Sequence, residues 1–302
     1  MKVSRLRKRL GRILNFLKKP LIKSIRRNEN VGTDHHGSQV ALKMIWRNMR
    51  DCAPEKRPKF SEVGFRCFSQ FEEDGILLYI FSVIGEKSKI VVEMCAGSGN
   101  ECMATNLIVN HNWQGFLFDG NKKMVQDGQL FFNSPRSTFF HPPVFTHAWI
   151  TAENVNELIR DAMKLKPEQT EVDLLSLDID GMDYWIWKSL DIISPRVVIM
   201  ETNCLIPYDM PLTVKYAPES TYKHGDVYIG ASIAAMVKLS REKGYRLIGA
   251  HRHGFNAIFM RDDVGLKYFP EVTAESLHYN SEIRHAQATR WLSAKSLPWV
   301  EV

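Results

Sequence analysis

The sequence has few features of a secreted or membrane-spanning protein. No stretch approaches the roughly 20 apolar residues that a membrane-spanning helix needs. The N-terminus lacks the uninterrupted apolar core and small-residue cleavage site of a secretory signal. The cysteines are odd in number and lack the paired spacing of a zinc site or a disulfide framework, which indicates a reducing, cytoplasmic compartment. They are Cys52, Cys67, Cys95, Cys102 and Cys204.

Acidic residues are absent from the first 27 positions, which contain eleven lysines and arginines. The chain of 302 residues carries a net charge of +6, yet residues 28–302 hold 29 basic and 34 acidic side chains, a net charge of −5. The body therefore lacks the basic surface of a nucleic-acid-binding domain, and we expect no nucleic-acid partner. An apolar content of 44% and a charged content of 25% are ordinary for a globular protein, here one catalytic domain with an appendage.

The basic segment 1–27 also has an apolar face. Lysines and arginines fill the opposite side of the predicted helix, and Pro20 is expected to kink it. Such a helix suits an anionic membrane surface, where each basic side chain contributes about 1 kcal/mol, and we expect the protein at the inner face of the cell membrane. Alternatively, the helix docks on the enzyme's own body or on a partner, or the tail binds RNA nonspecifically. The apolar residues at helical spacing are Leu6, Leu10, Ile13, Leu14, Leu17, Leu21 and Ile25.

Strands alternate with helices in residues 65–265, after a predicted linker and lead-in at 28–64. Residues 69–72 have the form of a capping box before an apolar helix that ends at Gly85. Alternating strands and helices demand a parallel sheet, and the turn 251–254 joins the last two strands as a hairpin. This predicts a Rossmann-like, doubly wound α/β fold whose seven-stranded sheet is mostly parallel with one antiparallel edge strand. The predicted strands are 89–94, 115–119, 145–150, 172–180, 196–201, 245–250 and 256–260, and predicted helices include 101–109, 152–165 and 231–243.

A glycine-containing turn joins the first predicted strand to the next helix. Gly97 and Gly99 follow Glu93 there, and because glycine has no Cβ, a ligand can approach the backbone closely. The second strand ends at Asp119, where an acid can accept hydrogen bonds from both ribose hydroxyls of an adenosine ligand. The turn alone is often only a tight connection, but the two features together predict a nucleoside-binding site.

Six segments of residues 65–265 carry the most distinctive sequence: SQFEEDG, VVEMCAGSGNECMATN, WQGFLFDGN, LLSLDIDGMDYWIW, VVIMETN and GYRLIGAHRHGFNAIFMR. Together they resemble FkbM-like class I methyltransferases and related uncharacterised proteins of polysaccharide gene clusters. The resemblance implies that S-adenosylmethionine is the cofactor, that Glu93, Gly97 and Gly99 line its methionine end, and that Asp119 holds its ribose. Cys95 stands where the family usually has the first loop glycine. This departure supports the alternative of a noncatalytic binding or scaffold protein with the same fold.

Acidic and amide side chains end the fourth and fifth predicted strands. Asp178 and Asp180 alternate, so we expect them to point to the same side, at the strand ends where open α/β sheets bind ligands. Asp180, with Glu201 and Asn203 from the fifth strand, would suit Mg²⁺ with water completing the shell. The set resembles that of metal-dependent O-methyltransferases, in which the metal eases loss of a hydroxyl proton. Alternatively, these side chains cap helices or hydrogen-bond the substrate directly.

Methyl transfer requires an acceptor oxygen aligned with the methyl group and a base that removes its proton. Asp180 is favoured as the base by its place at a strand end. The irregular stretch 204–230 predicts a lid over the substrate or, alternatively, a dimer arm that would make a homodimer, and 266–302 is a C-terminal extension. The candidate bases are Asp180, His147, His251 and His253.

These features predict O-methylation of a small-molecule or glycan acceptor, either a sugar or a lipid-linked glycan intermediate, at the cytoplasmic membrane face. An NAD-dependent oxidoreductase or epimerase would share the acid that ends the second strand. Cys102 disfavours it, because this residue occupies the place of the third glycine in a G-x-G-x-x-G turn. Tyr184 and Lys188 have the Tyr-x-x-x-Lys spacing of such enzymes, but they lie on an aromatic segment that we expect to be buried.

Overall fold

The structure is a computed structural model that describes residues 36–134, 138, 140–165, 171–221, 226–278 and 280–302. The chain divides into two compact units, residues 1–40 and 41–302. The predicted amphipathic helix at 1–27 lies outside the described residues, as does most of the predicted linker that follows it. Within the described part of the chain, no helix has both the length and the apolar character needed to cross a bilayer.

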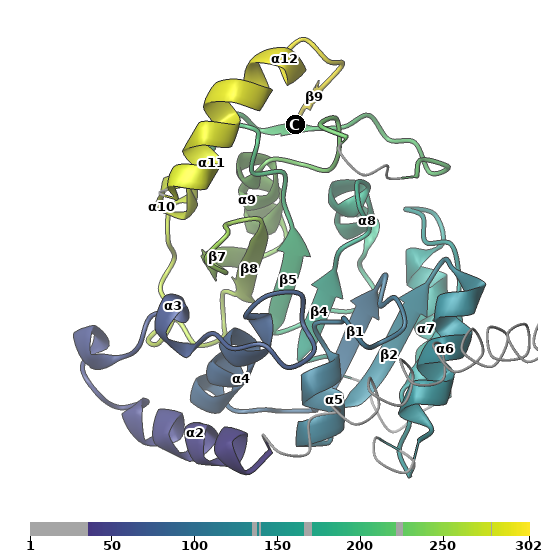
Figure 1. Cartoon of the computed structure of the whole chain (residues 1–302), viewed down its shortest axis with the longest axis vertical. Coiled ribbons are helices and arrows are strands. Elements are labelled where there is room, and N and C mark those ends of the chain that lie inside the picture. Colours follow the sequence, from purple (N-terminus) through teal and green to yellow (C-terminus); the bar gives the residue numbers. More distant parts are fainter. Residues whose placement is uncertain (1–35, 135–137, 139, 166–170, 222–225, 279) are drawn as a thin grey trace, which may run out of the picture. The chain divides into compact units, whose positions relative to one another are not determined.

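A seven-stranded sheet forms the centre of the second unit, with the strand order β3-β2-β1-β4-β5-β8-β7 (Figure 1). The first five strands in this order run parallel, whereas β8 is antiparallel to both of its neighbours. The predicted Rossmann-like α/β fold is therefore confirmed, and the antiparallel strand is the inner member of the edge hairpin. The strands are β1 (Ile90–Met94), β2 (Gln114–Asp119), β3 (Val144–His147), β4 (Leu174–Leu177), β5 (Val197–Glu201), β7 (Tyr245–Ala250) and β8 (Asn256–Arg261).

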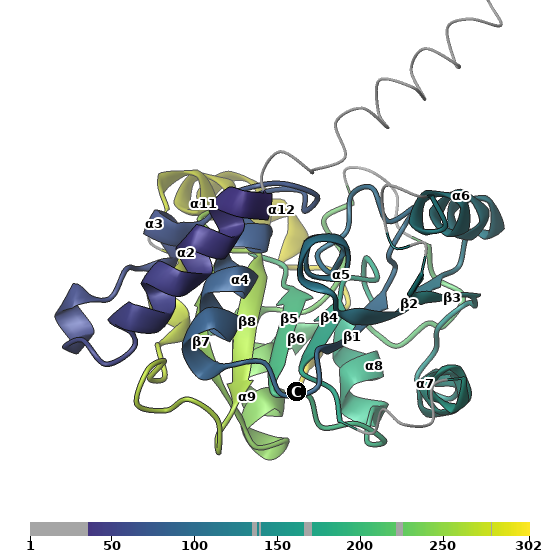
Figure 2. The same ribbon diagram turned by 90° about the horizontal axis from the view of Figure 1, so that it is seen from below.

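Helices cover both faces of this sheet (Figure 2). The helices α4, α5 and α6 lie on one face, and α7, α8 and α9 lie on the other. Every residue of β1, β2 and β4 is buried, because a parallel sheet between two helical layers has no solvent-facing side. Most residues of these strands are therefore apolar. The helices are α4 (Glu73–Ile84), α5 (Thr105–His111), α6 (Lys122–Phe132), α7 (Val155–Lys164), α8 (Asp183–Ser189) and α9 (Ile233–Glu242).

A buried carboxylate fixes the amino ends of three parallel strands. Asp173, just before β4, accepts hydrogen bonds from the backbone nitrogens of Lys87 at 2.9 Å and of Ser88 and Lys89 at 2.8 Å, just before β1. It also pairs with Arg196, just before β5, at 2.8 Å. The amino ends of these strands are thus held together, and because the strands are parallel, their carboxyl ends lie side by side at the other end of the sheet.

The predicted capping box at 69–72 differs from the observed start of α4. The helix begins at Glu73, and the reciprocal bonds span five residues rather than three. Asp74 accepts from the backbone nitrogens of Cys67, Phe68 and Ser69, while the Ser69 hydroxyl accepts from the Asp74 nitrogen at 3.2 Å. The carboxylate of Asp74 accepts hydrogen bonds from three successive backbone nitrogens before the helix. The helix therefore begins later than the capping-box pattern at 69–72 predicts.

The described segments outside the sheet contain further helices and a short strand pair. The predicted linker and lead-in at 28–64 contains α2 (His36–Met49) and α3 (Phe60–Val63), and Trp46 packs edge-on against Tyr79 of α4. The C-terminal extension contains α10 (Ala274–Leu277), α11 (Ser281–Ala286) and α12 (Leu292–Ala294). Its last strand, β9 (Val300–Glu301), pairs with β6 (Leu212–Thr213) inside the insertion 204–230, so the two segments form one structure.

Candidate functional site

A cavity of about 750 Å³ lies at the carboxyl ends of β1, β2 and β4. Cys95 follows β1, Asp119 ends β2, and Asp180 lies in the turn after β4; all three line this cavity, which we call the cofactor cavity. The strand order reverses between β1 and β4. Open α/β sheets bind ligands in the crevice at such a reversal, so the cavity lies where the fold favours a ligand.

The turn after β1 is shaped by two glycines with different surroundings. Both have backbone φ angles in the left-handed region, +57° at Gly97 and +73° at Gly99. A Cβ atom added to Gly97 would meet nothing within 4 Å, whereas one added to Gly99 would lie 2.5 Å from the ring of Phe132. Gly97 therefore leaves space beside the turn, while Gly99 is required by packing against α6. Neither glycine is among the residues that line the cofactor cavity, so their contact with a cofactor stays a prediction.

Asp119 connects this turn to the end of β2. One carboxylate oxygen accepts from the backbone nitrogen of Gly97 at 2.8 Å, and the other accepts from Asn121 at 2.7 Å. The side chain is buried, yet it lines the cofactor cavity. Because an ionised carboxylate has about four acceptor positions, two remain for a ligand. This geometry suits the predicted grip on a ribose.

Glu93 is buried in β1 and is not among the residues that line the cofactor cavity. Its carboxylate accepts hydrogen bonds from the Cys102 thiol, the backbone nitrogens of Met103 and Ala104, and the Ser176 hydroxyl. Burial raises the pKa of Glu93, and these four donors oppose that rise. The side chain fastens the start of α5 to the sheet, so in this structure Glu93 positions the turn, and a direct contact with the cofactor stays a prediction.

Cys95 adopts a backbone conformation that normally belongs to glycine. Its φ angle is +62°, and its exposed side chain forms part of the wall of the cofactor cavity. The left-handed region is strained for most residues with a Cβ. This explains why a glycine is expected at this position, and it shows that the cysteine keeps the glycine-like turn without filling the cavity.

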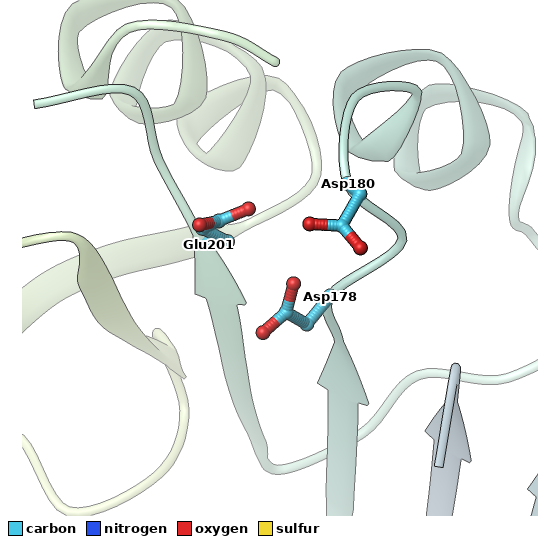
Figure 3. A group of neighbouring side chains, drawn as sticks. All are labelled: Asp178, Asp180 and Glu201. Atoms are coloured by element: carbon cyan, nitrogen blue, oxygen red, sulfur yellow. The ribbon is translucent and has the colours of Figure 1, made fainter. Parts of the chain in front are cut away.

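Three carboxylates meet where β4 and β5 end (Figure 3). Oxygen atoms of Asp178, Asp180 and Glu201 all lie within 4.8 Å of one another. Burial and the nearby carboxylates of Asp183 and Asp180 raise the pKa of Asp178 to about 8, and burial together with Asp178 holds the pKa of Glu201 well above its usual range. Without a cation, the group therefore retains a proton near neutral pH. Three oxygen ligands at this spacing form a donor set that suits a hard divalent cation.

The predicted metal set included Asn203 rather than Asp178. The Asn203 amide nitrogen donates to the carbonyls of Val227 at 3.2 Å and Ile229 at 2.9 Å, and its oxygen accepts from the Leu205 nitrogen. These bonds hold the insertion 204–230 to the end of β5. The side chain of Asn203 is thus occupied by hydrogen bonds to backbone atoms of the insertion. Asp178, rather than Asn203, joins Asp180 and Glu201 in the acidic group.

The raised pKa of Asp178 predicts a pH-dependent stability. The folded state retains a proton that the unfolded state releases above its ordinary pKa of 3.8, so this stabilisation is complete below about pH 4 and is lost as the pH rises to about 8. In EDTA, the Tm should therefore fall between about pH 5 and about pH 8. Asp178→Asn should unfold about 2–4 °C higher than the parent at pH 8, the shift that about 1 kcal/mol gives.

Asp161→Asn is the matched control for this measurement, because Asp161 is exposed and, among the described residues, forms an ion pair with its helix neighbour Lys164 alone. Its Tm should follow that of the parent at both pH values. A parallel fall of the parent and Asp178→Asn would show that Asp178 is not the source of the pH dependence.

The predicted histidines lie in different places. His147 ends β3, is exposed and lines the cofactor cavity, and its Nε2 lies 3.1 Å from the Gly120 carbonyl. His253 lies in the β7–β8 turn against the ring of Phe71 and is not among the residues that line the cofactor cavity. His251 is buried, and burial lowers its pKa. Of the three histidines, His147 is therefore the one beside Asp119 and Asp180.

A second cavity of about 250 Å³, which we call the acceptor cavity, shares Asp180 with the cofactor cavity. Met182, Ser220 and Thr221 also line both. Its far wall comes from the insertion 204–230, which Tyr228 ties to the C-terminal segment by donating to the Pro298 carbonyl at 2.7 Å. The sequence did not single out these wall residues, since they have no motif and come together through contacts between distant segments, among them the pairing of β6 with β9.

Trp149 is a further cavity residue that the sequence did not single out. It lines the cofactor cavity after β3, is half exposed, and donates from its indole nitrogen to the Pro218 carbonyl at 2.7 Å. This bond connects the β3 side of the cavity to the insertion. An exposed tryptophan beside a cavity is a signal of ligand contact, but one tryptophan among seven has no distinguishing pattern in the sequence.

No family model and no curated protein matches the sequence of this chain. Solved structures to which this chain is similar include several methyltransferases. Magnesium protoporphyrin IX methyltransferase from Synechocystis PCC 6803, with bound SAM, is 15% identical, with 79% of this chain and 96% of that chain covered and a TM-score of 0.41. The N-terminal domain of EvdMO1, with SAH bound, is 9% identical over 64% and 82% of the chains, with a TM-score of 0.42.

The plantazolicin methyltransferase BamL, in complex with a triazolic desmethylPZN analog and SAH, is 12% identical. The match covers 91% of this chain and 93% of that chain, with a TM-score of 0.38. These likenesses concern the fold, so we argue the function from the chain's own residues.

Proposed function

We propose that this protein is an S-adenosylmethionine-dependent O-methyltransferase. The observation that carries the proposal is the position of Asp180, which lies in the wall of both the cofactor cavity and the acceptor cavity. S-adenosylmethionine would occupy the cofactor cavity with its ribose on Asp119, and the acceptor would occupy the smaller cavity. The reacting oxygen and the methyl group would then meet beside a carboxylate.

The chain's own residues supply what methyl transfer needs. The sulfonium is already an activated donor, so alignment and removal of the acceptor proton are the main tasks of the protein. Burial raises the pKa of Asp180, which brings this carboxylate closer to the range in which a general base is effective. His147 is the second candidate base, because it lines the same cavity.

A hydroxylated acceptor fits the lining of the acceptor cavity. Ser220, Thr221 and Tyr228 contribute hydroxyl groups, and Lys215 adds a cation. A volume of about 250 Å³ is small, which favours a single sugar unit over an extended chain inside the cavity. Together with the family resemblance, this supports a sugar or the sugar end of a lipid-linked glycan as the acceptor.

Mg²⁺ would fit the group formed by Asp178, Asp180 and Glu201, whose oxygens have suitable chemistry and spacing. A bound cation would lower the pKa of an acceptor hydroxyl. Titration of the protein with Mg²⁺ alone should then release protons from the group, and Glu201→Gln should weaken this binding at least about tenfold. Methyl transfer that is unchanged in EDTA would remove the metal from the proposal.

The basic segment 1–27 supports a peripheral place at the inner face of the cell membrane, because its sequence combines eleven positive charges with apolar residues at helical spacing. Deletion of residues 1–27 should move the protein from the membrane pellet to the soluble fraction. An unchanged distribution between the two fractions would contradict this assignment.

Calorimetry with S-adenosylmethionine tests the proposed function directly. The protein should bind it with micromolar affinity, and mass spectrometry of the copurifying ligand should find S-adenosylmethionine or S-adenosylhomocysteine. No heat with the intact protein and no nucleoside in the purified sample would remove the proposal.

Cys95 favours one competing function, a noncatalytic binding or scaffold protein. If the chain is an enzyme, Cys95→Gly should change the affinity for S-adenosylmethionine by less than about threefold, because the backbone already has the glycine-like turn. Cys95→Val should lower the free energy of unfolding by about 1–3 kcal/mol, since a β-branched residue is strained in this region. A tenfold or greater gain of affinity in Cys95→Gly would instead favour the noncatalytic protein.

A further inference from the structure

A third cavity, of about 970 Å³, lies beside the edge strand β7 and shares no lining residue with the cofactor and acceptor cavities. We call it the edge cavity. Three segments far apart in the sequence form most of its wall: 54–61 from the lead-in, 248–250 at the end of β7, and 266–277 from the C-terminal extension. Tyr79 of α4 and Arg252 complete the lining. Its size is within the range of about 300–1,000 Å³ that is usual for small-molecule sites.

Aromatic rings form the apolar part of the edge cavity. Phe60, Tyr79 and Phe269 are in mutual contact, with ring centroids between 5.7 and 6.5 Å apart. The backbone of Gly249 packs so closely on Phe60 that an added Cβ atom would lie 2.7 Å from the ring. The rings are therefore held in place by the sheet edge, and they offer a preformed apolar surface.

The charged part of the edge cavity has one sign only. Arg57, Lys59, Arg252 and Lys267 line it, and none of its lining residues is an aspartate or a glutamate. This is unusual for a body that has more acidic than basic residues. The cofactor cavity differs, since Lys122 lines it together with Asp119 and Asp180. The all-positive lining of the edge cavity favours an anionic ligand.

Two of these cations have no ion pair with a carboxylate among the described residues, namely Arg57 and Lys59. The guanidinium of Arg57 donates to the carbonyls of Lys267 and Tyr268 at 2.9 and 3.3 Å, so it is oriented but not neutralised. Arg252 pairs with Glu72 at 3.1 Å, and Lys267 lies 3.9 Å from Asp51. The edge cavity thus has positive charge available for an anion.

Tyr79 also adds a polar group to the edge cavity. The residue lines the cavity beside Phe60 and Phe269, and its hydroxyl could donate a hydrogen bond to an oxygen atom of a ligand.

We propose that the edge cavity binds the phosphate end of a lipid, with the phosphate among Arg57, Lys59 and Lys267 and the first part of the hydrocarbon chain on the rings of Phe60, Tyr79 and Phe269. An uncharged apolar ligand would leave Arg57 and Lys59 without an anionic partner. A free anion would leave the aromatic surface exposed. The inference does not require the proposed methyl transfer, and it gives the protein a second ligand site on another part of the sheet edge.

Calorimetry of the full chain with farnesyl monophosphate, below its micelle concentration, tests this inference. It should bind with micromolar affinity, whereas farnesol and inorganic phosphate should each bind at least about tenfold more weakly. Equal affinity for farnesol would overturn the role of the cations, and equal affinity for inorganic phosphate would overturn the role of the rings. Absence of binding by farnesyl monophosphate would overturn the whole inference.

Two variants locate the binding. Lys59→Glu reverses an exposed charge at the edge cavity, and Ser61→Trp puts a large side chain at an exposed position of its wall; each should weaken binding at least about tenfold. Lys295→Glu is the matched control, because it makes the same charge change at an exposed position outside the edge cavity. Segment 1–27 is itself basic and apolar, so it could bind the same ligand. Unchanged binding in either cavity variant would therefore show that the ligand is not bound in the edge cavity, and it would overturn the inference.

Discussion

Asp119→Ala is expected to abolish binding of S-adenosylmethionine. The substitution removes the proposed acceptor of two ribose hydroxyls, and hydrogen bonds to a charged group contribute about 1.5–3 kcal/mol each. Their loss corresponds to an affinity at least about 100-fold weaker. It also removes the acceptor for the backbone nitrogens of Gly97 and Asn121, so the turn beside the cavity loses its support. Calorimetry with the parent and the variant measures the difference.

Two further variants separate the ribose contact from the loss of support. Asp119→Asn keeps one acceptor oxygen and should bind with intermediate affinity. Asp127→Ala removes an aspartate from α6 that pairs with Lys123 at the surface, and it should bind as the parent does. Wild-type affinity in Asp119→Ala, with the variant folded, would show that the nucleoside is not bound at the end of β2.

The sequence was sufficient to predict the sheet because its strands are buried on both sides. The apolar-rich segments 89–94 and 172–180 and the hairpin at 245–260 lie where β1, β4, β7 and β8 were found. Short connections and right-handed crossovers limit the possible strand orders, but the observed order comes from the structure. The ends of elements were less accurate, since contacts made elsewhere in the chain decide them, as Asp74 does before α4.

Other parts of the molecule have no local signal at all. The pairing of β6 with β9 joins two-residue strands from the insertion and the C-terminal segment, and neither has a periodicity that a pattern could detect. The acceptor cavity and the edge cavity both depend on such distant segments. The basic segment 1–27 lies outside the described residues, so its predicted membrane contact rests on the sequence alone.

The acidic group shows how backbone conformation limits a prediction from spacing. Alternation in a strand was expected to put Asp178 and Asp180 on one side, but β4 ends at Leu177 and Asp180 has a φ angle of +55°. The two side chains meet because the chain turns there, not because the strand continues. Asn203 was expected to join them from its position after β5, but its amide donates to the carbonyls of Val227 and Ile229 instead. These partners lie 24 and 26 residues away in an irregular segment, so no local pattern predicts the contact.

Asp180→Asn is expected to lower kcat for methyl transfer about 10²–10⁴-fold, the usual effect of removing a general base. Asparagine is among the residues that best tolerate the left-handed backbone found at this position, so the turn after β4 should be preserved. The affinity for S-adenosylmethionine should change by less than about threefold, because Asp119 is proposed to carry the ribose contact. The measurement is transfer of a labelled methyl group to a panel of free sugars and to a sugar-lipid extract.

The pH profile of this reaction distinguishes Asp180 from His147 as the base. In the parent, the rate should rise with pH as Asp180 loses its proton, and burial places this rise above the ordinary range for an aspartate. Asp180→Asn should lose this rise together with its activity. His147→Gln should keep the rise and lower kcat by less than about tenfold, because His147 lines only the cofactor cavity and Asp180 lines both cavities. If His147→Gln instead loses the pH-dependent rise while Asp180→Asn keeps it, the proton is removed by the histidine, and Asp180 serves the acceptor or a cation.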